Sequence, residues 1–207
     1  VGRSDGGGGR ASAIKNLRMY ARNEYGKDEV KYKFFSNSDH NKFKRFMIRG
    51  PGHRPDCTPR DDLADLLLQN LNMDIQHVQH VTLFVNGEYW GLHTIKERFD
   101  QDYLALKYGK KDDDYVILRN SGILDSGEEG YELPYLDLLD YVQTNNMSTE
   151  ESYNHVKEQL DIDNYLSYFA CEVYMGNVDW INTNIKFYRY KAADNNLMSG
   201  NALDGKW

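Results

Sequence analysis

The sequence predicts an α+β fold of two lobes, and three features of its pattern lead to that prediction. Alternating apolar and polar runs, typical of strands, dominate residues 1–98, which also carry one helix. Amphipathic helical patterns dominate residues 99–207. Within that second part, a polar loop over residues 176–185 leads from a helix into a strand. We therefore expect a strand-rich N-terminal lobe and a helix-rich C-terminal lobe, with the boundary near residues 97–100.

Three short segments of the first lobe predict strands. "KNLRMYAR" (15–22) alternates apolar and basic residues, which is typical of a half-exposed strand. "VKYKFF" (30–35) repeats that pattern, and "FKRFMIRG" (43–50) is a third candidate. A β-hairpin is predicted over residues 81–97, because Asn-Gly at positions 86 and 87 separates two β-rich runs. Asn-Gly suits a type I′ turn, in which both central residues have positive φ.

Residues 58–73 predict the one helix of the first lobe. Thr58 can cap its N-terminus, Pro59 suits the first helical position, and Asp61 and Asp62 favour the positive end of the helix dipole. Four leucines fall on one face, which we expect to pack against another element. They are Leu63, Leu66, Leu67 and Leu71.

The second lobe is predicted to be mostly helical. Helical patterns cover residues 100–109, from an Asp cap to a Gly stop, and residues 131–145, 148–160 and 163–176. Ser148-x-x-Glu151 opens the third helix as a capping box, and Gly176 ends the fourth. A strand is expected at 185–191, and a turn at Asp204-Gly205 leads into a further expected strand.

Composition and charge exclude several classes of protein. The 207 residues carry a formal net charge of -7, which argues against a nucleic-acid binder and suits a basic protein substrate better. No run approaches the roughly 18 apolar residues that a membrane span needs. The opening "VGRSDGGGGR" has no apolar stretch, so no signal peptide is expected in this chain.

The polar loop "GNVDWINTNIKFYRY" (176–190) carries the main candidate site. Asp179 and Asn184 have the Asp-x-x-x-x-Asn spacing of the catalytic loop of protein kinases. There the Asp positions the substrate hydroxyl or accepts its proton, and the Asn holds a magnesium ion beside the phosphates. The alternative is a cluster of Asx turns, in which the amides only tie down the backbone after a helix end.

Several blocks of the chain resemble the spore-coat protein H (CotH) kinase family. "RDDLADLLLQN…VTLFVNGEYWGLHTIKERFDQDYL" is similar to the family's helix, Asn-Gly hairpin and following Asp-led helix. "GGRASAIKNLRMYAR" is similar to its Gly-rich entry, and "FMIRG" and "DNYLSYFACEVYMGNVDWINTNIKFYR" match later blocks. These blocks lie in order between about residues 6 and 190.

The resemblance implies an atypical protein-kinase fold that moves the γ-phosphate of ATP to serine or threonine of a protein, with Mg²⁺ as the metal. By position, it implies that Asp179 is catalytic and that Asn184 binds the metal. It assigns Arg10, Lys15 and Glu97 to the nucleotide, the last beside the adenine. The substrate would be a protein, Ser-rich and basic, and the location the spore coat, the cell surface or outside the cell.

One departure from the family limits the expected activity. Its metal-binding Asp lies just after the strand that "GKW" (205–207) is expected to begin, and Asp204 is better explained by a turn. We therefore expect a C-terminally truncated kinase fold that is inactive or nearly so as a fragment.

Two alternative functions are open at this stage. The first is a pseudokinase or assembly protein of the same fold. The second is a carbohydrate-binding surface module, since Trp90, Trp180 and 16 Tyr could stack on sugars. His77 and His80 are interpreted as surface or strand-entry histidines and not as zinc ligands.

Overall fold

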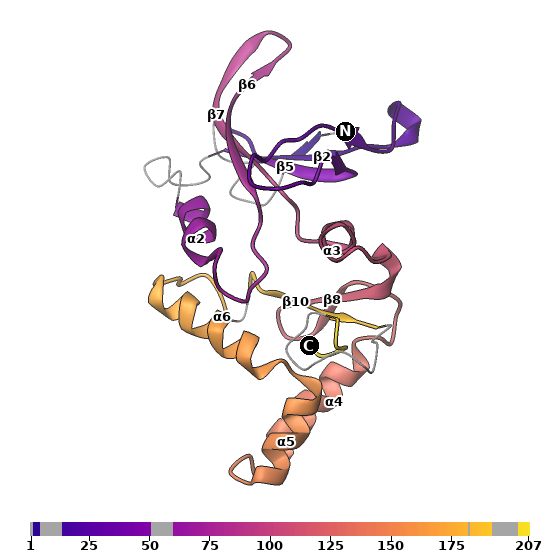
Figure 1. Cartoon of the computed structure of the whole chain (residues 1–207), viewed down its shortest axis with the longest axis vertical. Coiled ribbons are helices and arrows are strands. Elements are labelled where there is room, and N and C mark those ends of the chain that lie inside the picture. The colour runs from indigo at the N-terminus through magenta and orange to yellow at the C-terminus, as the bar shows by residue number, and fades with distance from the viewer. Residues whose placement is uncertain (1, 5–13, 51–59, 182, 192–202) are drawn as a thin grey trace. The chain divides into compact units, whose positions relative to one another are not determined.

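The computed structural model describes residues 2–4, 14–50, 60–181, 183–191 and 203–207 (Figure 1). The chain divides into two compact units. Unit 1 comprises Val1–Asn70 and Asp74–Tyr103, and unit 2 comprises Leu71–Met73 and Leu104–Trp207. Antiparallel sheets and helices together make this an α+β protein, as the sequence predicts. None of the helices in the described part combines the length and apolar character that a bilayer crossing requires.

Unit 1 is built on a five-stranded antiparallel sheet with the strand order β1-β2-β5-β7-β6. The strands are β1 (Gly2–Ser4), β2 (Leu17–Tyr20), β5 (Arg45–Arg49), β6 (Val78–Val85) and β7 (Glu88–Lys96). A separate two-stranded ribbon pairs β3 (Val30–Lys31) with β4 (Lys42–Phe43), and a short 3-10 turn η1 spans Asn23–Tyr25. The three predicted strand regions are therefore present, although the region 30–35 forms only a two-residue strand.

The core of unit 1 is aromatic. Phe46 and Ile48 of β5 alternate with more exposed neighbours, so both point to the buried side of the sheet. They pack with Phe43 and with Phe35, which is fully buried although it follows the end of β3. The alternation of apolar and polar residues at 43–50 thus corresponds to a strand with one buried face.

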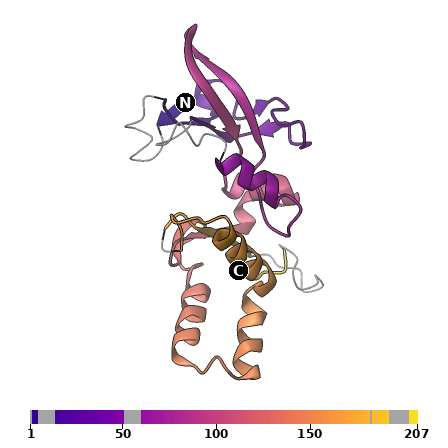
Figure 2. The same ribbon diagram turned by 90° about the vertical axis from the view of Figure 1, so that its left-hand side faces the viewer.

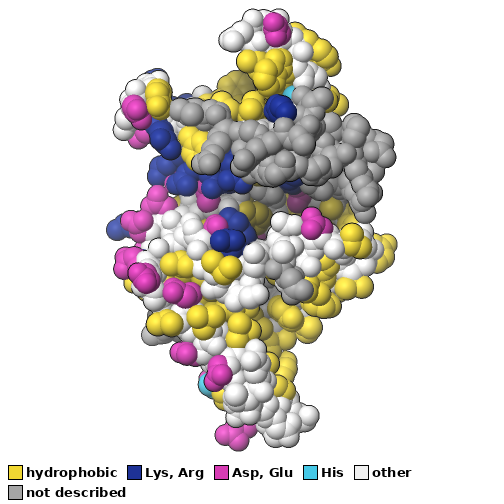
Figure 3. All heavy atoms as spheres, turned by 180° about the vertical axis from the view of Figure 1, so that it is seen from behind, with side chains coloured by type: hydrophobic (Ala, Val, Ile, Leu, Met, Phe, Trp, Pro, Cys, Tyr) yellow, Lys and Arg dark blue, Asp and Glu magenta, His cyan; other side chains and the backbone are white. Residues whose placement is uncertain are grey.

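The predicted hairpin is confirmed. Asn86 and Gly87 have φ values of 52° and 84°, as a type I′ turn requires, and they join β6 to β7. The ladder shifts register between Leu83 and Phe84, which marks a bulge near the tip. Figure 1 shows the hairpin extending past β2 and β5, and Figure 3 shows hydrophobic side chains along it. The most exposed of these are Phe84 and Tyr89, at 60% and 66%.

Helix α2 (Arg60–Leu68) corrects one prediction. It ends at Leu68 and not at residue 73, and the predicted caps Thr58 and Pro59 lie outside the described residues. The four leucines that we expected to pack are 46–59% exposed, whereas Asp62 is only 6% exposed. Asp62 accepts a hydrogen bond of 2.9 Å from Thr94 Oγ1 on β7. The helix therefore turns a polar face to the sheet, where Thr94 and Lys96 of β7 donate to Asp62 and Asp65.

Unit 2 contains a three-stranded antiparallel sheet and most of the described helices. The sheet order is β10-β8-β9, formed by β8 (Tyr115–Arg119), β9 (Ile123–Ser126) and β10 (Lys186–Tyr190). The helices are α4 (Leu133–Thr144), α5 (Glu150–Gln159) and α6 (Ile162–Tyr174), and η3 (Asp112–Asp114) precedes β8. Figure 2 shows α4 and α5 as an antiparallel pair, and the rings of Tyr141 and His155 meet between them, 3.9 Å apart.

The centre of unit 2 is a strand that the sequence analysis did not predict. Residues 115–118 of β8 are all buried, and Val116 and Leu118 form a core with Leu138 of α4 and with Trp207. A continuous apolar run of this kind lacks the alternation by which half-buried strands are recognised. The strand expected at 205–207 is also not formed. Instead, the Trp207 amide donates to Gln159 O and its carbonyl accepts from the Asp161 amide.

Helix ends follow local signals, with one correction. Helix α3 (Gln101–Tyr108) is capped by Asp100 Oδ1, which accepts from the Tyr103 amide, and it stops at Gly109 with φ 66°. In α5 the cap is Thr149, whose hydroxyl accepts from the Ser152 amide, so the predicted capping box at Ser148 is wrong. The division of the chain into domains at residue 98 stays a prediction.

Candidate functional site

The candidate loop begins at a structured helix end. Helix α6 closes with a Schellman motif, in which the Gly176 amide donates to Val173 O and the Asn177 amide donates to Glu172 O. Gly176 takes φ 63°, a left-handed conformation that glycine adopts without steric cost. The motif fixes the direction in which the chain leaves the helix, so the loop starts from a defined point.

Asn177 ties the first turn of the loop to the helix. Its Nδ2 donates to a carboxylate oxygen of Glu172 at 2.7 Å, and its Oδ1 accepts from the Asp179 amide at 3.0 Å. The second contact is an Asx turn, which holds the backbone at Asp179. Glu172 also hydrogen bonds to Tyr168 one turn earlier. Burial and this carboxylate together raise the pKa of Tyr168, so the phenol stays protonated and can donate to Glu172.

Trp180 anchors the middle of the loop on the same helix. Its indole meets the rings of Tyr168 and Phe169 edge to face, at centroid distances of 5.7 Å and 5.0 Å. The neighbouring Ile181 has φ 78°, a left-handed conformation that is strained for a β-branched side chain. Strain of this kind concentrates at functional loops and must be held in place by surrounding contacts.

Asn184 closes the loop. It has φ 58° and its Nδ2 donates to the backbone carbonyl of Asp179 at 3.2 Å. The next residue, Ile185, accepts a hydrogen bond from the Asn120 amide, and β10 then pairs with the buried strand β8. The loop is thus fixed at one end by α6 and at the other by the central strand of unit 2.

The arrangement leaves two oxygen-bearing groups available. Asp179 and Asn184 are both exposed, and neither the Asp179 carboxylate nor Asn184 Oδ1 makes a hydrogen bond or ion pair with another described residue. The amides of Asn177 and Asn184 do tie down the backbone, as the Asx-turn interpretation requires. That hydrogen bond uses the amide nitrogen of Asn184 and leaves its oxygen, a hard ligand suited to Mg²⁺, without a hydrogen bond to another described residue.

Of the three predicted nucleotide residues of unit 1, the structure describes Lys15 and Glu97. Arg10 lies outside the described residues. Lys15 is half-buried just before β2, and its carbonyl lies 3.2 Å from Nε2 of the buried His93. The adjacent Asn16 accepts a hydrogen bond from the Gly50 amide through Oδ1. These contacts hold the backbone at the entry to β2.

Glu97 is 2% exposed, and its carboxylate already has partners within unit 1. Oε1 lies 3.1 Å from His40 Nδ1, and Oε2 lies 2.8 Å from His77 Nδ1 and 2.9 Å from the His77 amide. Burial by itself would raise the pKa of Glu97. The hydrogen bonds from His77 and His40 outweigh burial and lower it, so this carboxylate is ionised.

Sequence reasoning missed a buried ion pair on β7. Lys96 is 4% exposed, and its Nζ lies 2.5 Å from Asp65 Oδ2 on helix α2. A lysine on a sheet strand paired with an acidic residue on the helix of the same lobe is also a feature of protein kinases. The available signal was the polar pair Thr94 and Lys96, two residues apart and so on one face of the predicted strand, because polar groups on a buried face need partners.

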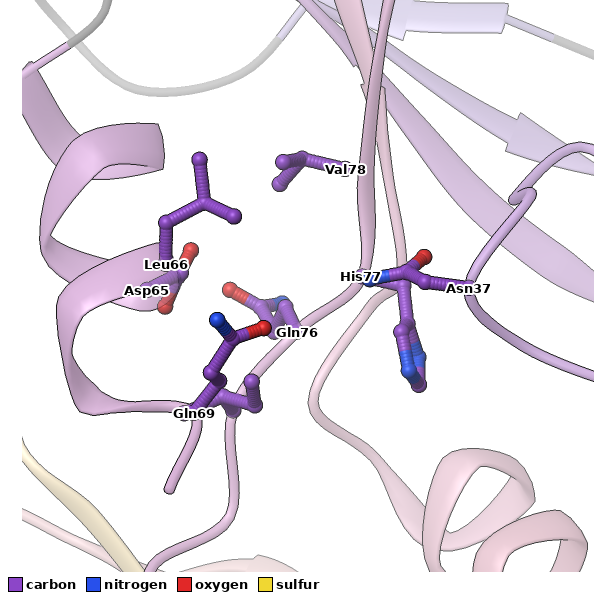
Figure 4. Close-up of a pocket in the computed structure, with 8 residues that line it drawn as sticks. Asn37, Asp65, Leu66, Gln69, Gln76, His77 and Val78 are labelled. Atoms are coloured by element: carbon purple, nitrogen blue, oxygen red, sulfur yellow. The ribbon is translucent and has the colours of Figure 1, made fainter. Parts of the chain in front are cut away.

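A small pocket lies between α2 and the start of β6 (Figure 4). Its polar lining includes Asp65, Gln69 and Gln76, and the Gln76 side chain donates to Glu97 O. Figure 4 shows that the His77 ring points away from α2. The pocket and the His77–Glu97 contacts are therefore on different sides of the chain at this point.

Comparison with protein families identifies the group to which the chain belongs. The family model described as CotH kinase protein matches residues 3–207. The chain belongs to the CotH kinase protein family. The match includes both the α6–β10 loop and Glu97, and it confirms the resemblance seen in the sequence. Membership in the CotH family makes this a kinase-like protein. A search of curated proteins gave no match.

Proposed function

We propose that this CotH-family chain carries the phosphotransferase site of an atypical protein kinase, acting from Mg-ATP on serine or threonine of a protein. The observation that carries the proposal is the α6–β10 loop. Its backbone is fixed by Asn177, Trp180 and Asn184, while the Asp179 carboxylate and the Asn184 oxygen stay available. Family membership and the Asp-x-x-x-x-Asn spacing support the same interpretation.

In the proposed reaction, Asp179 accepts a hydrogen bond from the substrate hydroxyl and takes its proton as the oxygen bonds to the γ-phosphorus. The bond from that phosphorus to the β,γ-bridging oxygen breaks, and ADP leaves with the electron pair. Asn184 Oδ1 would hold Mg²⁺, which when bound supplies charge neutralisation at the transferred phosphoryl group. The donor type fits, since Mg²⁺ prefers oxygen ligands.

The predicted nucleotide-binding residues are included in the proposal because of their positions in the family's sequence pattern. Arg10 and Lys15 would contact phosphates, and Glu97 would lie near the adenine. Asp204 is not proposed as a metal ligand, because its Oδ1 accepts from the Lys206 amide in a turn and its side chain is 7% exposed. We further propose a basic, Ser-rich protein substrate, which suits the net charge of -7, and a spore-coat or cell-surface location.

The test is transfer of labelled γ-phosphate from Mg-ATP to the protein itself and to a basic Ser-rich acceptor. It compares the chain with an Asp179→Asn variant, in the 207-residue form and in one continued past Trp207. Asp137→Asn is the matched control, since Asp137 is another exposed aspartate of unit 2, on α4. We expect Asp179→Asn to lower the rate by about 10²–10⁴-fold and Asp137→Asn to leave it unchanged.

Two outcomes would contradict the proposal. Equal transfer by Asp179→Asn and the parent would remove Asp179 from the reaction. Absence of transfer in every form, with Mg-ATP still bound, would make the chain a pseudokinase of the same family.

A further inference from the structure

Two histidines and a buried glutamate meet in unit 1, outside the loop proposed for catalysis. One ligand atom from each of His40, His77 and Glu97 lies within 4.8 Å of the other two. Among the described residues this is the only such group of three. His40 and His77 are 37 residues apart along the chain, and His77 and Glu97 are 20 apart, so no local sequence motif predicts the group.

Strand pairing holds two of the three residues rigidly. His77 and Glu97 flank the first pair of the β6–β7 ladder, Val78 and Lys96. The Glu97 amide donates to His77 O at 3.2 Å, and the His77 amide donates to Glu97 Oε2. These hydrogen bonds at the end of the ladder fix the backbone from which both side chains start, as a preformed binding site requires.

His40 completes the group from the loop between β3 and β4. Its amide donates to the hydroxyl of the buried Ser38, and the two imidazole rings meet edge to face at 6.0 Å. On the other side, the fully buried Phe35 contacts the His77 ring at 5.9 Å. The two histidine side chains are 20% and 23% exposed, so the group has an apolar wall on one side and solvent access on another.

We propose that His40, His77 and Glu97 form a binding site for a first-row divalent transition metal of the zinc class. Two imidazoles and one carboxylate are the ligands of open zinc sites, in which water takes the fourth position. Imidazole nitrogen favours zinc, copper or nickel over Mg²⁺ and Ca²⁺, so this site would not compete for the magnesium of the nucleotide.

The distances suit this assignment. Metal bonds of about 2.0–2.2 Å at tetrahedral angles place ligand atoms about 3.3–3.6 Å apart. The distances from His40 Nδ1 to Oε1 and from His77 Nδ1 to Oε2 of Glu97 are 3.1 Å and 2.8 Å, and the three ligand atoms lie within 4.8 Å of one another. Movements of up to about 1 Å would therefore admit the ion. The Glu97 carboxylate supplies an oxygen ligand, and His40, which lies in the loop between β3 and β4, can make that movement.

The competing explanation is a hydrogen-bonded brace, in which both Nδ1 atoms carry protons and only hold Glu97. Asparagine distinguishes the two, because its Nδ2 can replace Nδ1 as a donor but cannot replace imidazole as a ligand. His40→Asn and His77→Asn therefore keep a brace and remove a metal site. His80→Asn is the matched control, since His80 is on β6, 3.7 Å from the carboxylate of Asp62, but belongs to no group of three possible ligands among the described residues.

The experiment titrates Co²⁺ into the metal-depleted full chain without nucleotide, follows the visible absorption of the bound ion, and then adds Zn²⁺. We expect one tightly bound Co²⁺ that Zn²⁺ displaces, and a rise in melting temperature with Zn²⁺. His40→Asn and His77→Asn should weaken binding by more than the roughly 10–100-fold that loss of an outer partner costs, and His80→Asn should not.

Equal binding by His40→Asn and the parent, or no Co²⁺ binding by the parent, would overturn the metal site in favour of the brace. Because no nucleotide is present, this result does not depend on whether the chain transfers phosphate. It does bear on Glu97, whose carboxylate would serve the metal instead of the adenine.

Discussion

The buried pair of Lys96 and Asp65 allows a prediction whose size can be worked from the structure. The Lys96 side chain is 5% exposed and its ammonium lies 2.5 Å from a carboxylate that is 21% exposed. Replacement by methionine keeps most of the aliphatic volume of the lysine but removes its charge. Lys96→Met therefore leaves Asp65 without its lysine at the interface between α2 and the sheet.

Breaking a buried ion pair by removing one partner costs about 3–5 kcal/mol, because a charge stays behind in a poorly solvated place. Asp65 retains some contact with water, so we expect the lower end, about 3 kcal/mol of unfolding free energy. Replacing both members by apolar residues removes the carboxylate charge as well. The double variant Asp65→Leu/Lys96→Met should therefore recover most of the loss.

The measurement is urea unfolding followed by far-UV circular dichroism, with hydrogen exchange of the β7 amides to assign the effect to unit 1. We expect the single variant to be clearly less stable and the double variant to approach the parent. The reasoning is refuted if Lys96→Met unfolds within about 0.5 kcal/mol of the parent, the range of ordinary surface substitutions. It is also refuted if the double variant is no more stable than the single one.

Two further predictions concern the loop and the pH dependence of stability. Trp180→Ala should destabilise the ordered form of the α6–β10 loop by about 1–3 kcal/mol, since two aromatic contacts of about 0.5–1.5 kcal/mol each are lost. The loop amides should then exchange hydrogen faster in Trp180→Ala than in Trp180→Phe. Equal exchange rates in the two variants would argue that Trp180 does not anchor the loop. Burial raises the pKa of Asp100 above its ordinary 3.8, although Arg45 and Arg98 oppose this. The folded state then binds this proton more tightly, so stability falls as pH rises from about 3.8 through the raised pKa. Asp100→Asn should not show this loss of stability with rising pH, although Asn can still cap α3. Identical stability–pH curves for the variant and the parent would contradict the predicted direction of the pKa shift.

The sequence by itself determined the features that depend on a few neighbouring residues. The Asn86-Gly87 turn, the Asp100 cap and the Gly176 helix end all form where their residue types predict. Each of these residues relieves a local constraint, either a positive φ or an unpaired amide at a helix end, and the chain needs no distant contact for it. The spacing of Asp179 and Asn184 is likewise a local feature, which the sequence shows without any knowledge of distant contacts.

The tertiary structure alone decided which side chains of the helices and strands are buried and what they contact. The leucines of α2 suit a packed helix, but the acidic face of α2 lies against the sheet instead, where Asp65 pairs with Lys96 of β7. His77 was expected to be a surface or strand-entry histidine, and only the fold brought Glu97 and His40 into contact with it. Burying a charge without a partner costs far more than exposing a leucine, so pairing across the fold overrides the local pattern.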